Sequence, residues 1–173
     1  MATMDLAALI RDVPDFPVEG ILFKDITTLL QDADAFREAV DALASRYADR
    51  EIGQVVAIES RGFLLGAPLA YKLGAGLVPI RKAGKLPAKT ISAEYSLEYG
   101  TATLEMHVDA IHPGDKVLLV DDLLATGGSA KAATDLIERL GGVIVGVAFL
   151  IELEFLQGAK QLEGHDVFSL IRF

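Results

Sequence analysis

The stretch that decides the fold runs Val117-Leu118-Leu119-Val120-Asp121-Asp122-Leu123-Leu124-Ala125-Thr126-Gly127-Gly128-Ser129. Apolar β-forming residues end in two adjacent carboxylates, a short Thr/Gly/Gly/Ser loop follows, and a helical pattern begins at Ala130. This order predicts a strand over 116–120, a tight loop, and a helix whose N-terminus carries unpaired backbone N–H groups. Such groups bind phosphate, and the two glycines let the backbone approach it closely because they lack a Cβ atom.

The adjacent carboxylates of Asp121 and Asp122 narrow the choice of ligand. They would repel a bare phosphate, but they accept hydrogen bonds from sugar hydroxyls, so we expect a phosphorylated sugar. Ser129 is predicted to be the helix N-cap in either case, but a purely structural loop explains neither the paired acids after a buried strand nor the two glycines. A nucleotide P-loop is excluded because its Gly-Lys-Ser/Thr ending is missing, and no Gly-x-Gly-x-x-Gly pattern opens a helix.

The rest of the chain alternates strand and helix patterns. Strands are predicted over 55–58, 77–80, 116–120, 143–151 and 167–171, and helices over 4–12, 34–47, 62–73 and 129–140. An extended hairpin or mobile flap is predicted over 90–107. This alternation predicts an α/β fold with a central, mostly parallel sheet flanked by helices. Ligands bind at the carboxyl ends of such strands, so the loops 59–62, 81–85 and 121–129 are expected to converge.

Composition limits the classes of function. A chain of 173 residues with 51% hydrophobic content predicts one globular domain, and no apolar run reaches membrane-spanning length. The start of the chain lacks the pattern of a secretion signal, and the absence of cysteine excludes disulfides and thiolate catalysis, so we expect a cytoplasmic protein. A net charge of −9 argues against nucleic acid as a partner. Arg81, Lys82, Lys85 and Lys89 form a basic cluster, which in isolation would be read as a solvated loop. Because a phosphate site is already expected, we interpret it as a local anion-binding patch.

Residues 117–130 resemble the phosphoribosyl pyrophosphate signature of the type I phosphoribosyltransferases, in the version found in the branch that uses adenine. Further matches to that branch occur in the expected order along nearly the whole chain: Pro14-Asp15-Phe16-Pro17, Gly20-Ile21-Leu22-Phe23-Lys24-Asp25-Ile26-Thr27, Glu59-Ser60-Arg61-Gly62-Phe63, Arg81-Lys82-Ala83-Gly84-Lys85-Leu86-Pro87 and Tyr95-Ser96-Leu97-Glu98-Tyr99-Gly100. The resemblance implies the type I fold, with a small N-terminal hood over about 1–30 and a mobile flap over about 85–107.

The resemblance also implies a role for each motif. Asp121 and Asp122 would hold the ribose hydroxyls, and the loop of Ala125, Thr126, Gly127, Gly128 and Ser129 would hold the 5-phosphate. The pyrophosphate would be held by Ser60, Arg61, Arg81, Lys82 and Lys85, with a cis peptide bond between Glu59 and Ser60. The base would bind at Leu22, Phe23 and Lys24. The implied catalytic residues are Glu98, as the acid/base acting on the purine, Tyr99 and Arg61.

The reaction implied is transfer of the 5-phosphoribosyl group from phosphoribosyl pyrophosphate to adenine, giving AMP and pyrophosphate in purine salvage. It would use Mg²⁺ held mainly by substrate and water, in a homodimer. One alternative is the same chemistry on a 6-oxopurine, xanthine or orotate, against which the matches at 22–24 and 98–99 argue. Another is a non-catalytic sensor that binds nucleic acid, for which an acidic chain of single-domain length offers neither a basic face nor an added module.

Overall fold

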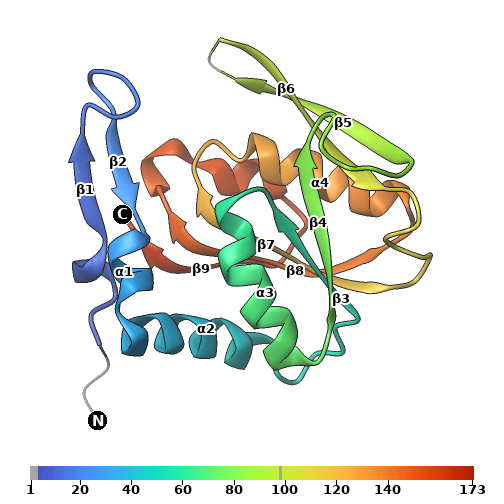
Figure 1. The fold of residues 1–173 in the computed structure, drawn as a ribbon, viewed down its shortest axis with the longest axis horizontal. Coiled ribbons are helices and arrows are strands. Elements are labelled where there is room, and N and C mark those ends of the chain that lie inside the picture. The colour runs from blue at the N-terminus through green and yellow to red at the C-terminus, as the bar shows by residue number, and fades with distance from the viewer. Residues whose placement is uncertain (1–3, 98) are drawn as a thin grey trace. The chain divides into compact units, whose positions relative to one another are not determined.

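The computed structural model describes residues 4–97 and 99–173. The chain divides into two compact units, Met1–Ala42 and Leu43–Phe173, which Figure 1 shows from blue to red in chain order. Each unit is described separately below. Residue 98 and residues 1–3 lie outside the described part of the chain.

The first unit holds a β-hairpin and short helices. Strand β1 (Arg11–Pro14) pairs antiparallel with β2 (Leu22–Asp25), and helix α1 (Thr27–Gln31) follows. Helix α2 (Ala33–Tyr47) begins here and continues into the second unit. The helix predicted over 4–12 is wrong, since only a single 3-10 turn forms there, η1 (Ala7–Leu9).

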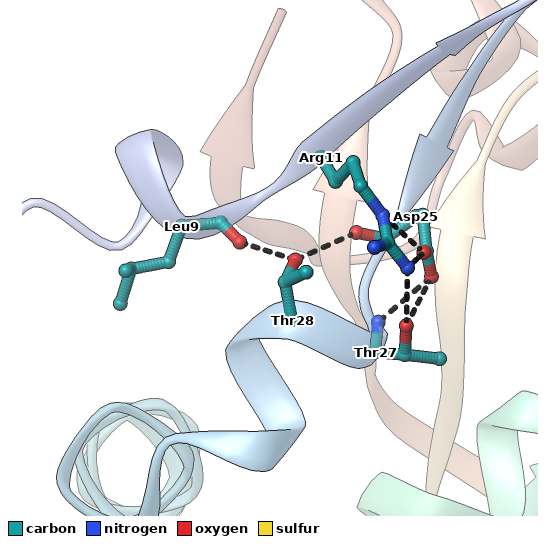
Figure 2. A network of polar contacts seen from close by, with 5 residues as sticks. All are labelled: Leu9, Arg11, Asp25, Thr27 and Thr28. Atoms are coloured by element: carbon teal, nitrogen blue, oxygen red, sulfur yellow. Dashed lines mark hydrogen bonds and ion pairs between the residues drawn. The ribbon is translucent and has the colours of Figure 1, made fainter.

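A polar network lies at the end of the predicted helix, where residues 11 and 12 belong to β1 instead (Figure 2). The Arg11 guanidinium donates two hydrogen bonds to Asp25 Oδ2, one of them from Nε at 3.0 Å. Asp25 Oδ1 accepts the Thr27 N–H at 2.9 Å, and the Thr28 hydroxyl donates to the Leu9 carbonyl at 2.6 Å. The Thr27 N–H first, and then Arg11, lower the pKa of Asp25 to about 2. These contacts favour the extended pairing of β1 and β2 over a local helix.

The second unit is built on a seven-stranded sheet with the order β5-β6-β4-β3-β7-β8-β9. Its strands are β3 (Gln54–Ile58), β4 (Gly76–Lys82), β5 (Thr90–Leu97), β6 (Gly100–His107), β7 (Lys116–Leu124), β8 (Val143–Glu152) and β9 (Val167–Arg172). Neighbouring strands pair parallel through the series β4-β3-β7-β8-β9. Strands β5 and β6 form an antiparallel hairpin, and β6 pairs antiparallel with β4. The prediction of an α/β fold with a mostly parallel central sheet is confirmed.

Two helices cover opposite faces of this sheet. Helix α4 (Gly128–Arg139) packs its apolar residues into one core cluster with Val56 and Ile58 of β3. Helix α3 (Arg61–Leu73) approaches the other face, where its Gly66 lies against Ala57. Successive side chains of a strand point to opposite faces of the sheet, so Val56 and Ile58 lie on one face and Ala57 on the other. The two helices therefore pack on opposite faces. Two 3-10 segments, η2 (Glu154–Leu156) and η3 (Gly158–Leu162), connect β8 to β9.

Strand β7 is longer than predicted at its carboxyl end, which is the end that lies at the site. It was expected to stop at Val120, but it continues to Leu124. Its pairing with β3 ends at Ala57↔Val120, whereas its pairing with β8 continues through Asp121↔Phe149. The two acids therefore lie in the part of β7 that extends beyond β3. There β7 pairs with β8 on one side and no longer with β3 on the other.

The hairpin predicted over 90–107 is confirmed, and it projects from the β4 side of the sheet (Figure 1). Arg139 near the end of α4 donates a hydrogen bond of 2.5 Å to the Ser92 carbonyl, which fastens β5 to that helix. The mobility expected of this flap stays a prediction. In the described ranges, 4–97 and 99–173, no helix has both the length and the apolar character needed to cross a membrane.

Candidate active site

A cavity of about 440 Å³ lies at the carboxyl ends of the parallel strands in the second unit. Its walls come from the three loops that the sequence predicted to converge, after β3, β4 and β7, with additions from β5 and β6. The lining residues are Ile58, Glu59, Ser60, Arg61, Lys82, Lys85, Tyr95, Leu104, Asp121, Asp122, Leu123, Ala125 and Ser129. The convergence of the three loops is thus confirmed, and most of the predicted phosphate and sugar ligands share one cavity.

The paired acids are buried at the floor of this cavity. Asp121 Oδ1 accepts the N–H of Asp122 at 2.8 Å, and Asp122 Oδ2 accepts a hydrogen bond from Arg61 Nε. Burial, and then the charge of Asp122, raise the pKa of Asp121 well above its ordinary value. Two carboxylates this close disfavour each other's charge, and hydroxyl donors from a sugar would relieve that cost. The sugar-binding role of this pair stays a prediction.

Arg61 begins helix α3 and reaches the cavity from the loop after β3. The peptide bond between Glu59 and Ser60 is cis, as the family resemblance predicted. Gly62 lets this loop rest against β7, because a Cβ at that position would lie 3.0 Å from Asp121 Oδ1. A cationic side chain at a helix N-terminus is unfavourable unless an anion lies nearby. Asp122 supplies one such anion, and the cavity leaves room for another.

Glu59 is a site residue that the sequence reasoning missed. Its carboxylate lines the cavity with a side chain only 8% exposed. Oε1 accepts from Lys85 Nζ at 2.6 Å and Arg81 Nη2 at 3.2 Å, and Oε2 accepts the Lys82 N–H at 2.9 Å. Burial alone would raise the pKa of Glu59, but these hydrogen bonds, that of Lys85 foremost, lower it to about 2. The signal in the sequence was the cationic run 81–85, which needs a nearby counter-charge.

The three cations of the turn 81–85 that were predicted to hold pyrophosphate divide into two groups. Lys82 and Lys85 line the cavity. Arg81 is not among its lining residues, and its guanidinium points instead to Glu59 and to the Lys85 carbonyl at 3.4 Å. The role of Arg81 in binding stays a prediction.

The predicted phosphate loop borders two cavities. Ala125 and Ser129 face the one already described, whereas Thr126 and Gly128 line a neighbouring cavity of about 290 Å³. The N-cap of α4 is Gly127, with φ +87°, so the prediction that Ser129 caps the helix is wrong. Glycine occupies that position because the left-handed conformation is strained for other residues. Ser129 lies instead in the first turn, with its side chain available to a ligand.

Tyr95 was also missed as a site residue, although its motif was noted. It lines both cavities and packs against Gly128, whose Cβ would lie 3.3 Å from the tyrosine ring. Burial, and then the charge of Asp121, raise the pKa of its hydroxyl. The signal was the alternation in β5, which turns Ile91, Ala93 and Tyr95 toward the core.

The predicted base-binding residues lie in the first unit, on β2. Phe23 lines an apolar cavity of about 270 Å³ together with Phe16, and the two rings meet edge to face with centroids 5.1 Å apart. Lys24 forms an ion pair with Asp12 at 2.6 Å, and Leu22 is half exposed. Phe16 in this cavity was not predicted. Of the two flap residues expected to be catalytic, Glu98 lies outside the described residues and Tyr99 is almost fully exposed.

Comparison with known proteins agrees with this geometry. Residues 26–171 match the family model described as "Phosphoribosyl transferase domain". The chain is 60% identical to the adenine phosphoribosyltransferase of Chloroflexus aurantiacus, over the full length of both. Its structure is similar to that of adenine phosphoribosyltransferase from Thermoanaerobacter pseudethanolicus, with a TM-score of 0.95, 54% identity and 98% of each chain covered.

A third similar structure is the adenine phosphoribosyltransferase of Saccharomyces cerevisiae, complexed with an imino-altritol bisphosphate and adenine. The TM-score is 0.91 and the identity 42%, with 96% of each chain covered. Family model, relatives and solved structures thus agree with one another, and the chain belongs to the phosphoribosyltransferase family, in the branch of the adenine phosphoribosyltransferases.

Proposed function

We propose that this protein transfers the 5-phosphoribosyl group from phosphoribosyl pyrophosphate to adenine, forming AMP and pyrophosphate in purine salvage. One observation carries the proposal: a single cavity gathers the buried carboxylates of Asp121 and Asp122, three cations, and Ser129 in the first turn of α4. A sugar with phosphate at both ends needs all three features at once. The relatives and solved structures named adenine phosphoribosyltransferases support the same reaction.

The two ends of the substrate would be held by different loops. The backbone of 125–129 and the Ser129 hydroxyl would hold the 5-phosphate, and Asp121 and Asp122 would accept from the ribose hydroxyls. Ser60, Arg61, Lys82 and Lys85 would hold the pyrophosphate. Breaking the bond at the anomeric carbon leaves negative charge on the departing pyrophosphate, and fixed cations stabilise that charge as it develops.

Mg²⁺ fits this cavity as an ion carried by the substrate. Within 4–97 and 99–173, no cluster of three or more His, Cys, Asp or Glu residues could hold a metal by itself. Mg²⁺ in phosphate-handling proteins is bound by one or two carboxylates, substrate oxygens and water. Bound there, the ion would neutralise charge on the leaving group. Asp121 and Asp122 line this cavity and would be the carboxylates that complete its coordination.

The base would be recognised by residues of β2. The apolar cavity beside Phe23 supports a place for a flat aromatic ring, which aromatic side chains bind by packing and edge contacts. Leu22 and Lys24 would complete the pocket. Glu98 would act as the acid/base on the purine, with Tyr99 beside it, once the flap closes and excludes water.

We also propose that the protein is a cytoplasmic homodimer. Leu64 and Tyr71 lie seven residues apart on α3 and are 48% and 91% exposed. Residues with this spacing share one helix face, and a second copy of the chain would cover them. Light scattering should then give twice the mass of the chain, and a monomer at all concentrations would contradict the proposal.

A base panel tests the reaction. The protein is incubated with phosphoribosyl pyrophosphate, Mg²⁺ and either adenine, hypoxanthine, guanine, xanthine or orotate, and pyrophosphate release is measured. We expect release with adenine alone, matched by an equal amount of AMP, and no release when EDTA removes the metal. Release with another base at a similar rate would overturn the choice of substrate. No release with any base would overturn the reaction.

A further inference from the structure

We infer that Glu59 is a positioning residue for the leaving group: its buried carboxylate holds the cationic turn 81–85 where it meets the pyrophosphate. The inference rests on the proposed function and deepens it. Glu59 would not touch the substrate's reacting atoms. It would act through Lys85 and Arg81, whose charges it fixes.

The contacts tie Glu59 to this turn at three points. Its side chain accepts from the Lys85 ammonium at 2.6 Å, the Arg81 guanidinium at 3.2 Å and the Lys82 N–H at 2.9 Å. Its own N–H donates to the Ile80 carbonyl at 2.8 Å, in register with β4. Backbone and side chain of one residue thus join the loop after β3 to the turn after β4.

Glu59 and Lys85 differ in burial, and the difference indicates which of the two is held fixed. The Glu59 side chain is 8% exposed, whereas the Lys85 side chain is 46% exposed and also lines the cavity. The carboxylate is therefore the fixed member of the pair and the lysine reaches outward. An ammonium carries three donors, so its contact with Glu59 leaves capacity for phosphate oxygens.

Electrostatics gives the reason for an acid in a site built for anions. Arg81, Lys82 and Lys85 lie within five residues, close to Arg61, and like charges at such separations repel. One buried carboxylate offsets part of this repulsion before the substrate arrives. The cations then need no rearrangement when the pyrophosphate binds, which is the condition for strong stabilisation of developing charge.

The same turn offers a matched control. Glu105 on β6 accepts the Gly84 N–H at 3.1 Å, so this carboxylate contacts the backbone of the turn rather than its cations. Glu105→Gln keeps a carbonyl acceptor for that N–H and removes a charge of the same sign. An effect found in Glu59→Gln but absent from Glu105→Gln belongs to the contacts with Lys85 and Arg81.

The experiment measures binding and turnover together. Calorimetry gives the Kd for inorganic pyrophosphate with Mg²⁺, and steady-state kinetics give kcat and the KM for each substrate. We expect Glu59→Gln to raise the pyrophosphate Kd and the KM for phosphoribosyl pyrophosphate at least about tenfold, with the KM for adenine unchanged. Glu59→Asp keeps the charge, so its pyrophosphate Kd should lie nearer the wild-type value. The pyrophosphate Kd of Glu105→Gln should stay within about twofold of the wild type.

A double variant shows whether Glu59 acts through Lys85. In a Lys85→Gln background, Glu59→Gln should raise the pyrophosphate Kd less than about threefold, because the contact it disrupts is already gone. Equal effects in both backgrounds, or a change below twofold in the single variant, would overturn the inference. If Glu59→Gln does not fold, Glu59→Ala, which also removes the carboxylate, replaces it, and an unchanged Kd in that variant has the same meaning. A wild type that binds pyrophosphate but forms no AMP would refute only the proposed reaction.

Discussion

Gly127→Ala is the substitution whose cost the structure specifies most closely. Gly127 is the N-cap of α4 with φ +87°, a conformation that costs a residue with a Cβ about 1–2 kcal/mol. A Cβ there would also overlap the Gly158 carbonyl and lie 3.1 Å from the Gln161 side chain. Overpacking of this kind adds about 1–3 kcal/mol. We expect a total loss of about 2–5 kcal/mol in the free energy of unfolding.

Gly164→Ala separates the two parts of that cost. Gly164 has φ +91°, yet a Cβ there would have no neighbour within 4 Å, so only the conformational strain remains. Denaturant unfolding of both variants measures the difference. Gly127→Ala should also raise the KM for phosphoribosyl pyrophosphate, because η3 would push the phosphate loop away. The reasoning is refuted if Gly127→Ala is no less stable than Gly164→Ala.

Two further predictions concern charged groups. Because burial, and then Asp122, raise the pKa of Asp121, the folded state binds its proton more tightly than the unfolded chain, and this carboxyl costs stability as the pH rises above its ordinary value of 3.8. Asp121→Asn should therefore be more stable than the wild type at pH 8 and should bind the sugar more weakly. Thermal unfolding measures the stability, and a variant less stable than the wild type at pH 8 would contradict the reasoning. Asp166 accepts two hydrogen bonds from Arg46, at 3.1 and 3.2 Å, and pairs with Arg50 at 2.7 Å, outside the cavity lining. Asp166→Asn should cost about 1 kcal/mol of stability at this partly exposed site and leave both KM values unchanged, and a changed KM would count against a purely structural role.

The sequence was sufficient for the fold and for the location of the site. Strand and helix periods differ enough to predict the strands and the helices α3 and α4 described in the second unit, but not the 3-10 segments η2 and η3. The rule for parallel sheets then brings three loops to one edge. The end of β7 could not be predicted in this way, because adjacent acids normally close a buried strand. Only the pairing with β8 beyond Val120 shows that Asp121 and Asp122 still belong to it.

Residues that act through others were the harder part to predict. Glu59 sits in a phosphate-binding motif, where its charge has the wrong sign for a ligand, and its partners are 22 to 26 residues away in sequence. Phe16 and Tyr95 reach their cavities only through the pairing of their own hairpins. Such contacts depend on tertiary structure, and neither periodicity nor motif spacing contains them. The same limit explains the failed helix over 4–12, because the contact of Arg11 with Asp25, 14 residues away, favours β1 at residues 11 and 12.

The division of the substrate between two groups of loops is tested most directly by a crossed binding measurement. Calorimetry would give the Kd for ribose 5-phosphate and for Mg²⁺ pyrophosphate in the wild type, Ser129→Ala and Arg61→Lys. The lysine keeps a cation beside Asp122 but loses the fork that binds two phosphate oxygens. We predict that Ser129→Ala weakens only ribose 5-phosphate and Arg61→Lys only pyrophosphate, each about tenfold. Equal weakening of both ligands by either variant would contradict the separation of the two ends within one cavity.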